Sequence, residues 1–262
     1  MSNSIFVIDC GDKRNKYIYE MLEKRGFDVM RIASDNIFDA DKKYVFLYAP
    51  AVRLTEELAD KIPVGSMVFC TDCCCDEVRR KLKKERSVKI FNYFDDEQLA
   101  VRNAMLTAEG ALAAVITGTD KSLADLNVLV LGGGRVGKCT ARILQTNGCK
   151  ISIATRRNDE HVLAPLFADF VYSFEEVDRI IHGFDAVINT IPSKILKKER
   201  LAMLKKNCFV LDLASKPGGI DTDAAGELGV NVMIYLGVPG KVAPKSAAEI
   251  LLDSVLVRAN SM

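Results

Sequence analysis

"NVLVLGGGRVGKCTARIL", residues 127–144, decides the fold of the second half of this chain. An apolar, strand-like run leads into three glycines with the spacing GxGxxG, and a helical pattern follows; the glycines are Gly132, Gly134 and Gly137. The first glycine permits a tight turn, the second lets a pyrophosphate approach the backbone, and the third lets the helix pack on the strand. The N-terminus of that helix favours negative charge. In this setting the motif predicts a dinucleotide-binding turn, with a glycine-rich turn that binds nothing as the alternative.

The next predicted strand, in KISIATRRND at 150–159, ends in two arginines. The end of the second strand of such a unit faces the adenosine ribose, where NAD-binding proteins place an Asp or Glu. A carboxylate there would repel a 2′-phosphate, whereas the guanidinium groups of Arg156 and Arg157 can bind one. We therefore predict NADP rather than NAD, with Thr155 as a hydrogen-bonding neighbour. The alternative is that both arginines are solvated charges at the start of a helix.

Two later strand ends are expected to contact the same ligand, because dinucleotides lie beyond the carboxyl ends of the strands. NTIPS at 189–193 and LDLASKPGG at 211–219 both pass from an apolar strand into a loop of small residues and proline. Ordinary turn chemistry is the alternative for each. The residues predicted to contact the cofactor are Gly132, Gly134, Arg135, Val136, Gly137, Thr155, Arg156, Arg157, Thr190, Ile191, Pro192, Ala214 and Ser215.

Strand-like and helical stretches alternate along the whole chain, which indicates an α/β fold. Strands are predicted at 5–9, 28–32, 44–48, 66–70, 88–91, 128–132, 151–155, 170–173, 186–190, 209–214 and 232–237, and long helices at about 95–117 and 244–259. We expect two doubly wound parallel-sheet domains, one flavodoxin-like and one a Rossmann NADP-binding domain, joined by a long helix. The predicted parts are a substrate or partner domain at 1–94, the connecting helix at 95–120, and the dinucleotide-binding domain at 121–262 with its C-terminal helix packing back.

The composition is ordinary for a soluble enzyme. The 262 residues carry a formal net charge of +1, which argues against a nucleic acid or an anionic membrane held by bulk charge. The N-terminus has only a short apolar run, and the most apolar long stretch, 99–118, contains Arg102, Asn103 and Glu109. We therefore expect no export signal, no membrane span and a cytoplasmic protein.

Eight cysteines include the cluster CTDCCC at 70–75. A thiolate metal site or redox sensor is one interpretation of Cys70, Cys73, Cys74 and Cys75, and a cysteine-rich loop and helix start is the other. Metal sites usually recruit a second pair of ligands, and the sequence contains no other CxxC and no paired histidines. We predict no metal site and leave the role of the cluster open.

A substrate is expected in a cleft between the two domains. Several cations follow strands at the carboxyl edges and suit a small anionic substrate, although a single lysine is more often a solvated surface residue. His161 and His182 are poorly placed, one on the adenosine side and the other before its strand. The candidate substrate ligands are Arg14, Asn15, Lys241 and Lys245, and the candidate catalytic residues are Lys216, Glu109 and Asp12.

These motifs together resemble one family. GDKRN (11–15), TAEGAL (107–112), LGGGRVGK (131–138), INTIPS (188–193), LDLASKPGG (211–219) and GVPGKVAPKSA (237–247) are similar to the A subunit of dipicolinate synthase, most clearly over 100–262. The resemblance implies NADP-dependent oxidation of dihydrodipicolinate to dipicolinate. It also implies that the partner is the flavoprotein-like B subunit of dipicolinate synthase, and a location in the mother-cell cytoplasm during sporulation. A dicarboxylate substrate would suit the cations Arg14, Lys216, Lys241 and Lys245.

Two other functions remain open. One is a different two-domain NADP-dependent dehydrogenase of small carboxylates, of the 2-hydroxyacid or shikimate type, although no histidine follows position 182 to serve as the late catalytic histidine of the former. The other is a non-catalytic NADP-binding protein that regulates or supports a partner, because no acid or base stands out. The oligomeric state is also open, and a homo-oligomer is compatible with the sequence.

Overall fold

A computed structural model describes residues 4–9, 11–32, 36–39, 41–48, 54–71 and 75–260. The chain divides into two compact units, the first formed by residues 1–103 and 243–262 and the second by 104–242. The dividing line falls inside one long helix, α4 (Glu97–Gly118), and the C-terminal helix belongs to the first unit. The predicted limits at 94/95 and 120/121 stay a prediction, and each unit is described separately.

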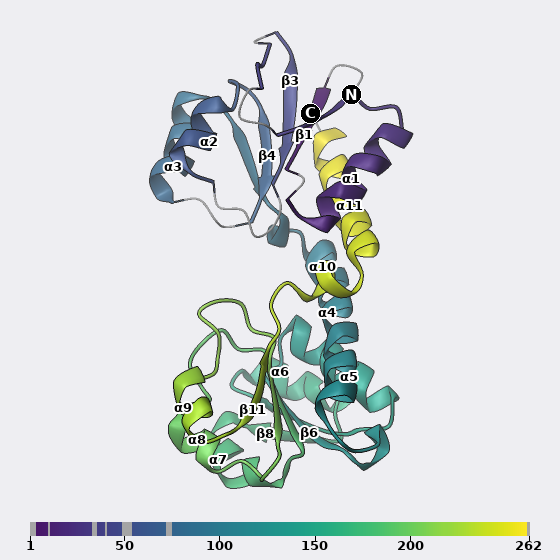
Figure 1. Ribbon diagram of the computed structural model, residues 1–262, viewed down its shortest axis with the longest axis vertical. Coiled ribbons are helices and arrows are strands. Elements are labelled where there is room, and N and C mark those ends of the chain that lie inside the picture. The colour runs from purple at the N-terminus through teal and green to yellow at the C-terminus, as the bar shows by residue number, and fades with distance from the viewer. Residues whose placement is uncertain are drawn as a thin grey trace. The chain divides into compact units, whose positions relative to one another are not determined.

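The first unit is a parallel sheet covered by helices (Figure 1). Its strands are β1 (Ser4–Ile8), β2 (Val29–Arg31), β3 (Lys43–Leu47), β4 (Met67–Cys70) and β5 (Lys89–Asn92). Its helices are α1 (Lys13–Lys24), α2 (Glu56–Lys61), α3 (Asp76–Arg80), a π-helical turn at Lys81–Glu85, a 3-10 turn at Tyr93–Asp95 and the C-terminal α11 (Pro244–Asn260). The strand order β2-β1-β3-β4-β5, with every pair parallel, is that of flavodoxin-like sheets. Helices α1 and α11 lie side by side on one face and α2 and α3 on the other.

The second unit is a larger parallel sheet with the strand order β11-β10-β9-β6-β7-β8. Its strands are β6 (Asn127–Leu131), β7 (Lys150–Thr155), β8 (Phe170–Ser173), β9 (Ala186–Asn189), β10 (Phe209–Asp212) and β11 (Asn231–Ile234). Its helices are α5 (Arg135–Thr146), α6 (Asn158–Leu163), α7 (Val177–Ile180), α8 (Lys198–Ala202), α9 (Thr222–Glu227) and α10 (Val238–Val242), with 3-10 turns at Leu123–Asp125, Ala164–Leu166, Phe174–Glu176 and Ile181–Gly183. Taken from the β8 edge to the β11 edge, this is the strand order typical of Rossmann domains. The direction in which successive strands are added reverses between β6 and β9.

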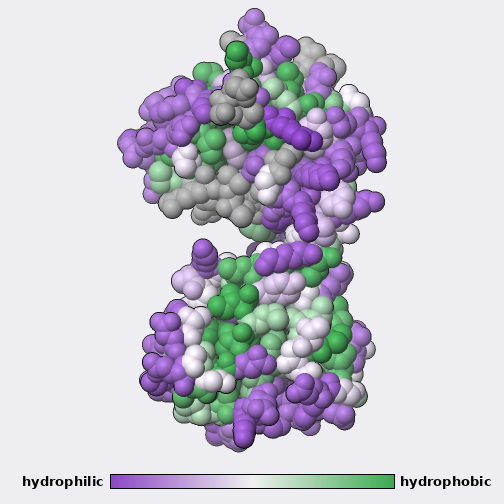
Figure 2. Space-filling view, viewed as in Figure 1, coloured by the Kyte–Doolittle hydropathy of each residue, from purple (hydrophilic) through white to green (hydrophobic). Residues whose placement is uncertain are grey.

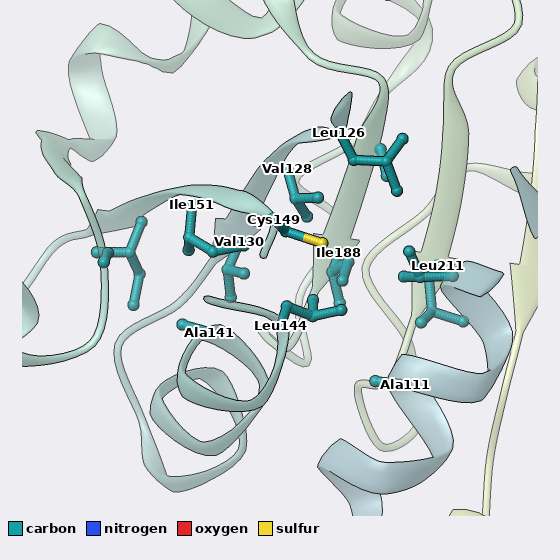
Figure 3. Close-up of a cluster of buried hydrophobic side chains, with 14 of the residues drawn as sticks. Ala111, Leu126, Val128, Val130, Ala141, Leu144, Cys149, Ile151, Ile188 and Leu211 are labelled. Atoms are coloured by element: carbon teal, nitrogen blue, oxygen red, sulfur yellow. The ribbon is translucent and has the colours of Figure 1, made fainter. Parts of the chain in front are cut away.

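The core of the second unit lies on both faces of β6. Val128 and Val130 pack with Leu144 of α5 and Ala111 of α4 on one face (Figure 3), whereas Leu129 and Leu131 belong to a second cluster on the other face. A strand that is buried on both sides reads as a continuous apolar run, which is why VLVL shows no alternation. Figure 2 shows hydrophobic residues in the middle of the visible face of this unit and hydrophilic residues along its lower margin.

The predicted α/β fold with two parallel sheets is confirmed, and each predicted strand is present with small shifts at its ends. The largest shifts are at β10 and β11, predicted to end at 214 and 237 but ending at Asp212 and Ile234. β10 stops early because the carboxylate of Asp212 accepts a hydrogen bond from the backbone N–H of Ala214, which turns the chain out of the sheet.

By length and composition alone, α4 could cross a membrane, and among the described helices no other could. The core helix of a soluble protein passes the same test, and 56% of the most apolar window of α4 is buried, so this is weak support for a span. The expectation of no membrane segment stays a prediction.

Candidate functional site

The glycine turn joins β6 to α5, and its glycines are required by close contacts. Gly132 has φ +106°, and a Cβ on it would lie 2.5 Å from Oγ1 of Thr190. A Cβ on Gly137 would lie 2.0 Å from the carbonyl oxygen of Gly132, so this glycine lets α5 pack against the turn. Gly134 caps α5 and has nothing within 4 Å of a built Cβ, which leaves its backbone open to a ligand. The first and third glycines therefore shape the turn, and the second provides the approach.

A cavity of about 620 Å³ opens beside this turn at the carboxyl edge of the sheet. Its lining residues are Gly132, Gly133, Gly134, Arg135, Val136, Lys138, Arg156, Arg157, Asp159, Glu160, Thr190, Ile191 and Pro192. Four of these side chains are basic and two are acidic. An exposed glycine backbone, the N-terminus of a twelve-residue helix and a surplus of positive charge fit the pyrophosphate of a dinucleotide.

Most of the predicted cofactor residues line this cavity, and four do not. Gly137 lies behind the turn, where it packs against Gly132. Thr155 is 2% exposed and its hydroxyl donates to the carbonyl oxygen of Arg157 at 3.2 Å, so it holds the chain as it leaves β7. Ala214 is buried and Ser215 is exposed on the loop after β10. The sequence missed Gly133, Lys138, Asp159 and Glu160 as cavity residues.

The two arginines after β7 have different surroundings. The Arg157 guanidinium is bound by Asp159, with Nε to Oδ1 at 3.1 Å and Nη2 to Oδ2 at 2.7 Å. The hydrogen bond from Arg157 lowers the pKa of Asp159, and that of Arg157 is raised. Arg156 instead lies over the Phe174 ring, with its guanidinium carbon 4.3 Å from the centroid. Among the described residues no carboxylate lies within 4.0 Å of Arg156, so its positive charge is not neutralised by an ion pair.

Glu160 brings a carboxylate to the glycine turn. A Cβ built on Gly133 would lie 2.8 Å from Cβ of Glu160 and 3.0 Å from its Oε2. The side chain of Glu160 is 18% exposed, and its Oε1 lies 3.9 Å from Nε of Arg157. A signal for this placement was present, because side chains in the first turn of a helix point back toward its N-terminus. Glu160 is in the first turn of α6, so it faces the loop from which the helix starts.

Asn189 and Asp212, which the sequence did not single out, form a buried polar pair at the same edge. They are the last residues of β9 and β10 and register partners in the sheet. Asn189 is 0% and Asp212 is 1% exposed, and Nδ2 of Asn189 donates to Oδ1 of Asp212 at 2.8 Å. Their remaining contacts bind the backbone of the two loops that follow these strands.

The predicted substrate and catalytic residues of the second unit are exposed. Lys216 follows β10 and has no hydrogen-bond or ion-pair partner among the described residues. Lys241 lies on α10 with Nζ 5.1 Å from the centroid of the Tyr235 ring. Glu109 is on the exposed side of α4. Lys245 is also exposed but belongs to α11 and therefore to the first unit. These side chains lie outside the lining of the cavity, so their roles stay predictions.

The predicted residues of the first unit meet in the turn between β1 and α1. Asp12 caps α1 and binds Arg14, which donates to it from the backbone N–H at 2.8 Å, from Nε at 2.9 Å and from Nη2 at 2.6 Å. Burial raises the pKa of Asp12, but the Arg14 contacts outweigh that effect and the net pKa is lowered. Asn15 is fully buried and donates to the carbonyl oxygens of Asp9 at 2.7 Å and Leu47 at 3.3 Å. In this structure Asp12 and Arg14 neutralise each other and Asn15 fastens the turn.

The described part of the cysteine cluster shows no metal-binding arrangement. Cys70 is buried and Cys75 is exposed; Cys73 and Cys74 lie outside the described residues. Within the described ranges, no three His, Cys, Asp or Glu side chains are grouped so that they could hold a metal ion.

Comparisons with known proteins agree with this geometry. The family described as shikimate / quinate 5-dehydrogenase matches residues 111–235, most of the second unit. The chain is 31% identical over 210 residues to the A subunit of dipicolinate synthase of Bacillus subtilis (strain 168), which covers 77% of this chain and 67% of that protein. Among solved structures, the A subunit of dipicolinate synthase from Bacillus halodurans has 27% identity and a TM-score of 0.86, covering 99% of this chain and 98% of the other. The A chain of dipicolinate synthase from Bacillus subtilis has 24% identity and a TM-score of 0.84, with 99% and 97% covered.

Proposed function

The chain belongs to the family of dipicolinate synthase A subunits, and from that premise we propose that it oxidises dihydrodipicolinate to dipicolinate with NADP. The family and the dehydrogenase fold make it an oxidoreductase with a site for a nicotinamide cofactor. The observation that carries the proposal is the cavity at the glycine turn, where an open Gly134 backbone and the N-terminus of α5 meet four basic side chains.

The charges of the cavity favour NADP over NAD. A 2′-phosphate brings two negative charges to the ribose side, where Arg156 carries no ion-pair partner among the described residues. Glu160 stands close to the turn and can accept a hydrogen bond from the 3′-hydroxyl, the one hydroxyl that this ribose keeps in NADP. The proposed ligand set therefore combines a hydroxyl acceptor with a phosphate-binding arginine.

Bound NADP would supply the hydride acceptor. Removal of a hydride and a proton from the dihydropyridine ring leaves an aromatic pyridine, so the protein must hold the two substrate carboxylates and let one proton leave. We assign the carboxylates to the cations Arg14, Lys241 and Lys245, with Asn15 as a neighbour, and the proton to Lys216, Glu109 or Asp12. Glu109 is favoured among the last three because its carboxylate is exposed and can accept a proton, whereas Asp12 is bound by Arg14 and a lysine ammonium must first lose its own proton.

The name of the relatives supports a partner. They are each one component of a synthase with more than one kind of polypeptide, and we propose that this chain likewise assembles with a flavoprotein-like B subunit. We further propose that the protein is located in the cytoplasm of the mother cell during sporulation.

The experiment combines the purified chain, NADP and freshly generated dihydrodipicolinate, with and without the B subunit, and follows dipicolinate absorbance. The proposal expects product formation that depends on this chain and on NADP. Product that forms equally fast without the chain contradicts a catalytic role. Faster formation with NAD than with NADP contradicts the cofactor assignment but leaves the reaction in place.

One observation favours a second candidate, a protein that binds NADP without catalysis. The predicted acid and cation of the first unit, Asp12 and Arg14, are bound to each other. In that case the chain binds NADP, and dipicolinate forms at the same rate whether or not the chain is added to the partner.

A further inference from the structure

We infer that Asp212, acting through Asn189, is a positioning residue for the dinucleotide, because this buried pair joins the loops after β9 and β10, the strands whose ends the nicotinamide half of a dinucleotide would meet. The inference rests on the proposed dinucleotide cofactor. It assigns to Asp212 and Asn189 the placement of the nicotinamide half of that cofactor. Both residues lie outside the cavity, so their effect on a ligand passes through the loops they hold.

Asn189 controls the first loop through Ile191. Its Oδ1 accepts from the Ile191 backbone N–H at 3.1 Å, and its Nδ2 donates to the Ile191 carbonyl oxygen at 3.0 Å. Both backbone groups of Ile191 are thus bound by one side chain. Ile191 lines the cavity, and a Cβ on Gly132 would lie only 2.9 Å from Cγ1 of Ile191. The position of this wall relative to the glycine turn therefore depends on Asn189.

Asp212 controls the second loop through Ala214 and Gly219. Oδ1 accepts from the Ala214 N–H at 3.1 Å, in addition to the bond from Asn189, and Oδ2 accepts from the Gly219 N–H at 2.9 Å. The carboxylate therefore ties both ends of the loop 214–219 to the end of β10. Lys216, one of the candidate catalytic residues, lies on this loop.

The two loops are also joined directly. A Cβ on Gly219 would lie 2.0 Å from Nδ2 of Asn189 and 2.9 Å from the carbonyl oxygen of Ile191, so only glycine fits there. The Gly219 carbonyl accepts from the backbone N–H groups of Ile195 at 3.0 Å and Leu196 at 2.9 Å. A displacement of one loop must therefore displace the other.

The chemistry of the pair requires a carboxylate at position 212. All the hydrogen bonds that the described residues give to Asp212 come from neutral N–H donors, and none of these residues places a Lys, Arg or His nitrogen within 4.0 Å of it. A buried carboxylate without a cation is costly, so this one is kept for its ability to accept at both oxygens. An asparagine in its place can accept from Asn189 and Ala214, but its own NH₂ group then faces the Gly219 N–H.

The strand order shows which half of the ligand these loops would meet. A dinucleotide lies across the point where the strand order reverses, which here is between β6 and β9. Arg156 follows β7 and assigns the adenosine half to that side. The other half then lies beyond the ends of β9 and β10, which are Asn189 and Asp212.

The test compares Asp212→Asn with Asp185→Asn, the same substitution at the opposite edge of the same sheet. Asp185 is also buried, but it lies immediately before β9 and binds Lys121 and Lys205. Hydrogen exchange of the backbone amides is measured first, without ligand. Dissociation constants are then measured for NADP and for 2′,5′-ADP, which lacks the nicotinamide half.

In Asp212→Asn we expect faster exchange at the amides of Gly219 and Ile191, and a dissociation constant for NADP raised by about tenfold, the equivalent of one buried N–H left unsatisfied. The constant for 2′,5′-ADP should change by less than about twofold. Asp185→Asn should leave the ratio of the two constants at its wild-type value, because its effect is on stability alone.

Three results would overturn the inference: no difference in amide exchange between the two variants, an equal loss of affinity for both ligands, or a wild-type chain that binds both ligands equally tightly. A wild-type chain that binds neither ligand contradicts the proposed cofactor itself, and that outcome is visible before any variant is made.

Discussion

The Arg156 guanidinium lies on one face of the Phe174 aromatic ring, 4.3 Å from its centroid, and the Arg200 guanidinium lies 4.9 Å from the same centroid. Arg200 is bound by Asp178 and by the carbonyl oxygen of Ile195, so it is held in place. Phe174 is 5% exposed and belongs to the core. The ring therefore offers a rigid platform that keeps Arg156 at the rim of the glycine-turn cavity.

This arrangement predicts that the two neighbouring arginines contribute unequally to cofactor choice. Arg156→Ala should raise the dissociation constant for NADP by about 10- to 100-fold, the usual loss for a charge-assisted hydrogen bond, and leave that for NAD unchanged. Arg157→Ala is the matched control and should change either constant by less than about fivefold, because Asp159 already binds its guanidinium. Titration with both dinucleotides checks this, and an effect of Arg157→Ala as large as that of Arg156→Ala would contradict it.

We predict that substitution of the second and of the third glycine in the turn will have different effects on stability. Gly137→Ala places a methyl group 2.0 Å from the Gly132 carbonyl, so it should cost about 1–3 kcal/mol of stability as well as dinucleotide binding. Gly134→Ala meets nothing within 4 Å, and replacing the glycine N-cap of α5 should cost no more than about 1 kcal/mol of stability. It should still weaken dinucleotide binding, because the methyl group occupies the backbone approach.

Thermal unfolding and NADP titration of both glycine variants make the comparison. Tight NADP binding by Gly134→Ala would mean that the ligand does not approach the backbone there.

We predict that Asp185 makes a pH-dependent contribution to the stability of the second unit. Burial raises its pKa, but hydrogen bonds from Lys205, Lys121 and the Asn127 backbone N–H outweigh this and lower the pKa to about 2. Because the pKa of Asp185 is lower in the folded state than its unfolded value of 3.8, the ionised carboxylate stabilises the folded protein above pH 3.8. This stabilisation is lost as the pH falls toward 2. Because both lysines are half-exposed, we expect Asp185→Asn to cost about 1–2 kcal/mol at pH 7.

Native-state hydrogen exchange of the β9 amides at several pH values measures this contribution. The difference between wild type and Asp185→Asn should shrink as the pH falls from about 5 toward 3. A difference that stays constant over this range would show that the charge of Asp185 is not its cause.

We predict that Asp96 anchors the C-terminal helix α11 in the first unit. Its Oδ2 accepts from Oγ of Ser254 and Nη1 of Arg258, both at 2.7 Å, and its Oδ1 accepts from the Leu99 N–H at the start of α4. Burial raises the pKa of Asp96, but these contacts outweigh it and lower the value to about 2. Asp96→Ala should therefore destabilise α11 by about 1–2 kcal/mol, seen as faster proteolysis near the C-terminus.

The control for Asp96 is Asp253→Ala, which breaks the exposed ion pair with Arg102. That pair has side chains 41% and 53% exposed, and its loss should cost less than about 0.5 kcal/mol. Equal proteolysis of the two variants would mean that Asp96 does not anchor the helix.

Much of the candidate site could be predicted because it depends on local patterns. The strand before Gly132, the glycine spacing and the arginines after β7 are short-range features, and they line one cavity in the structure. Glu160 was missed because its approach to Gly133 depends on where α6 starts. Asn189 and Asp212 were missed because they are 23 residues apart in sequence and meet only as register partners in the sheet.

The sequence by itself determined the two α/β halves and the dinucleotide turn, because apolar runs of strand length and glycines at fixed spacing act within a few residues of each other. The tertiary structure decided how charges pair. It bound Asp12 to Arg14 and Arg157 to Asp159, laid Arg156 on Phe174, and buried Asp212 beside Asn189. Whether a charged side chain is neutralised depends on which strands become neighbours and where each helix begins, and no single segment contains that information.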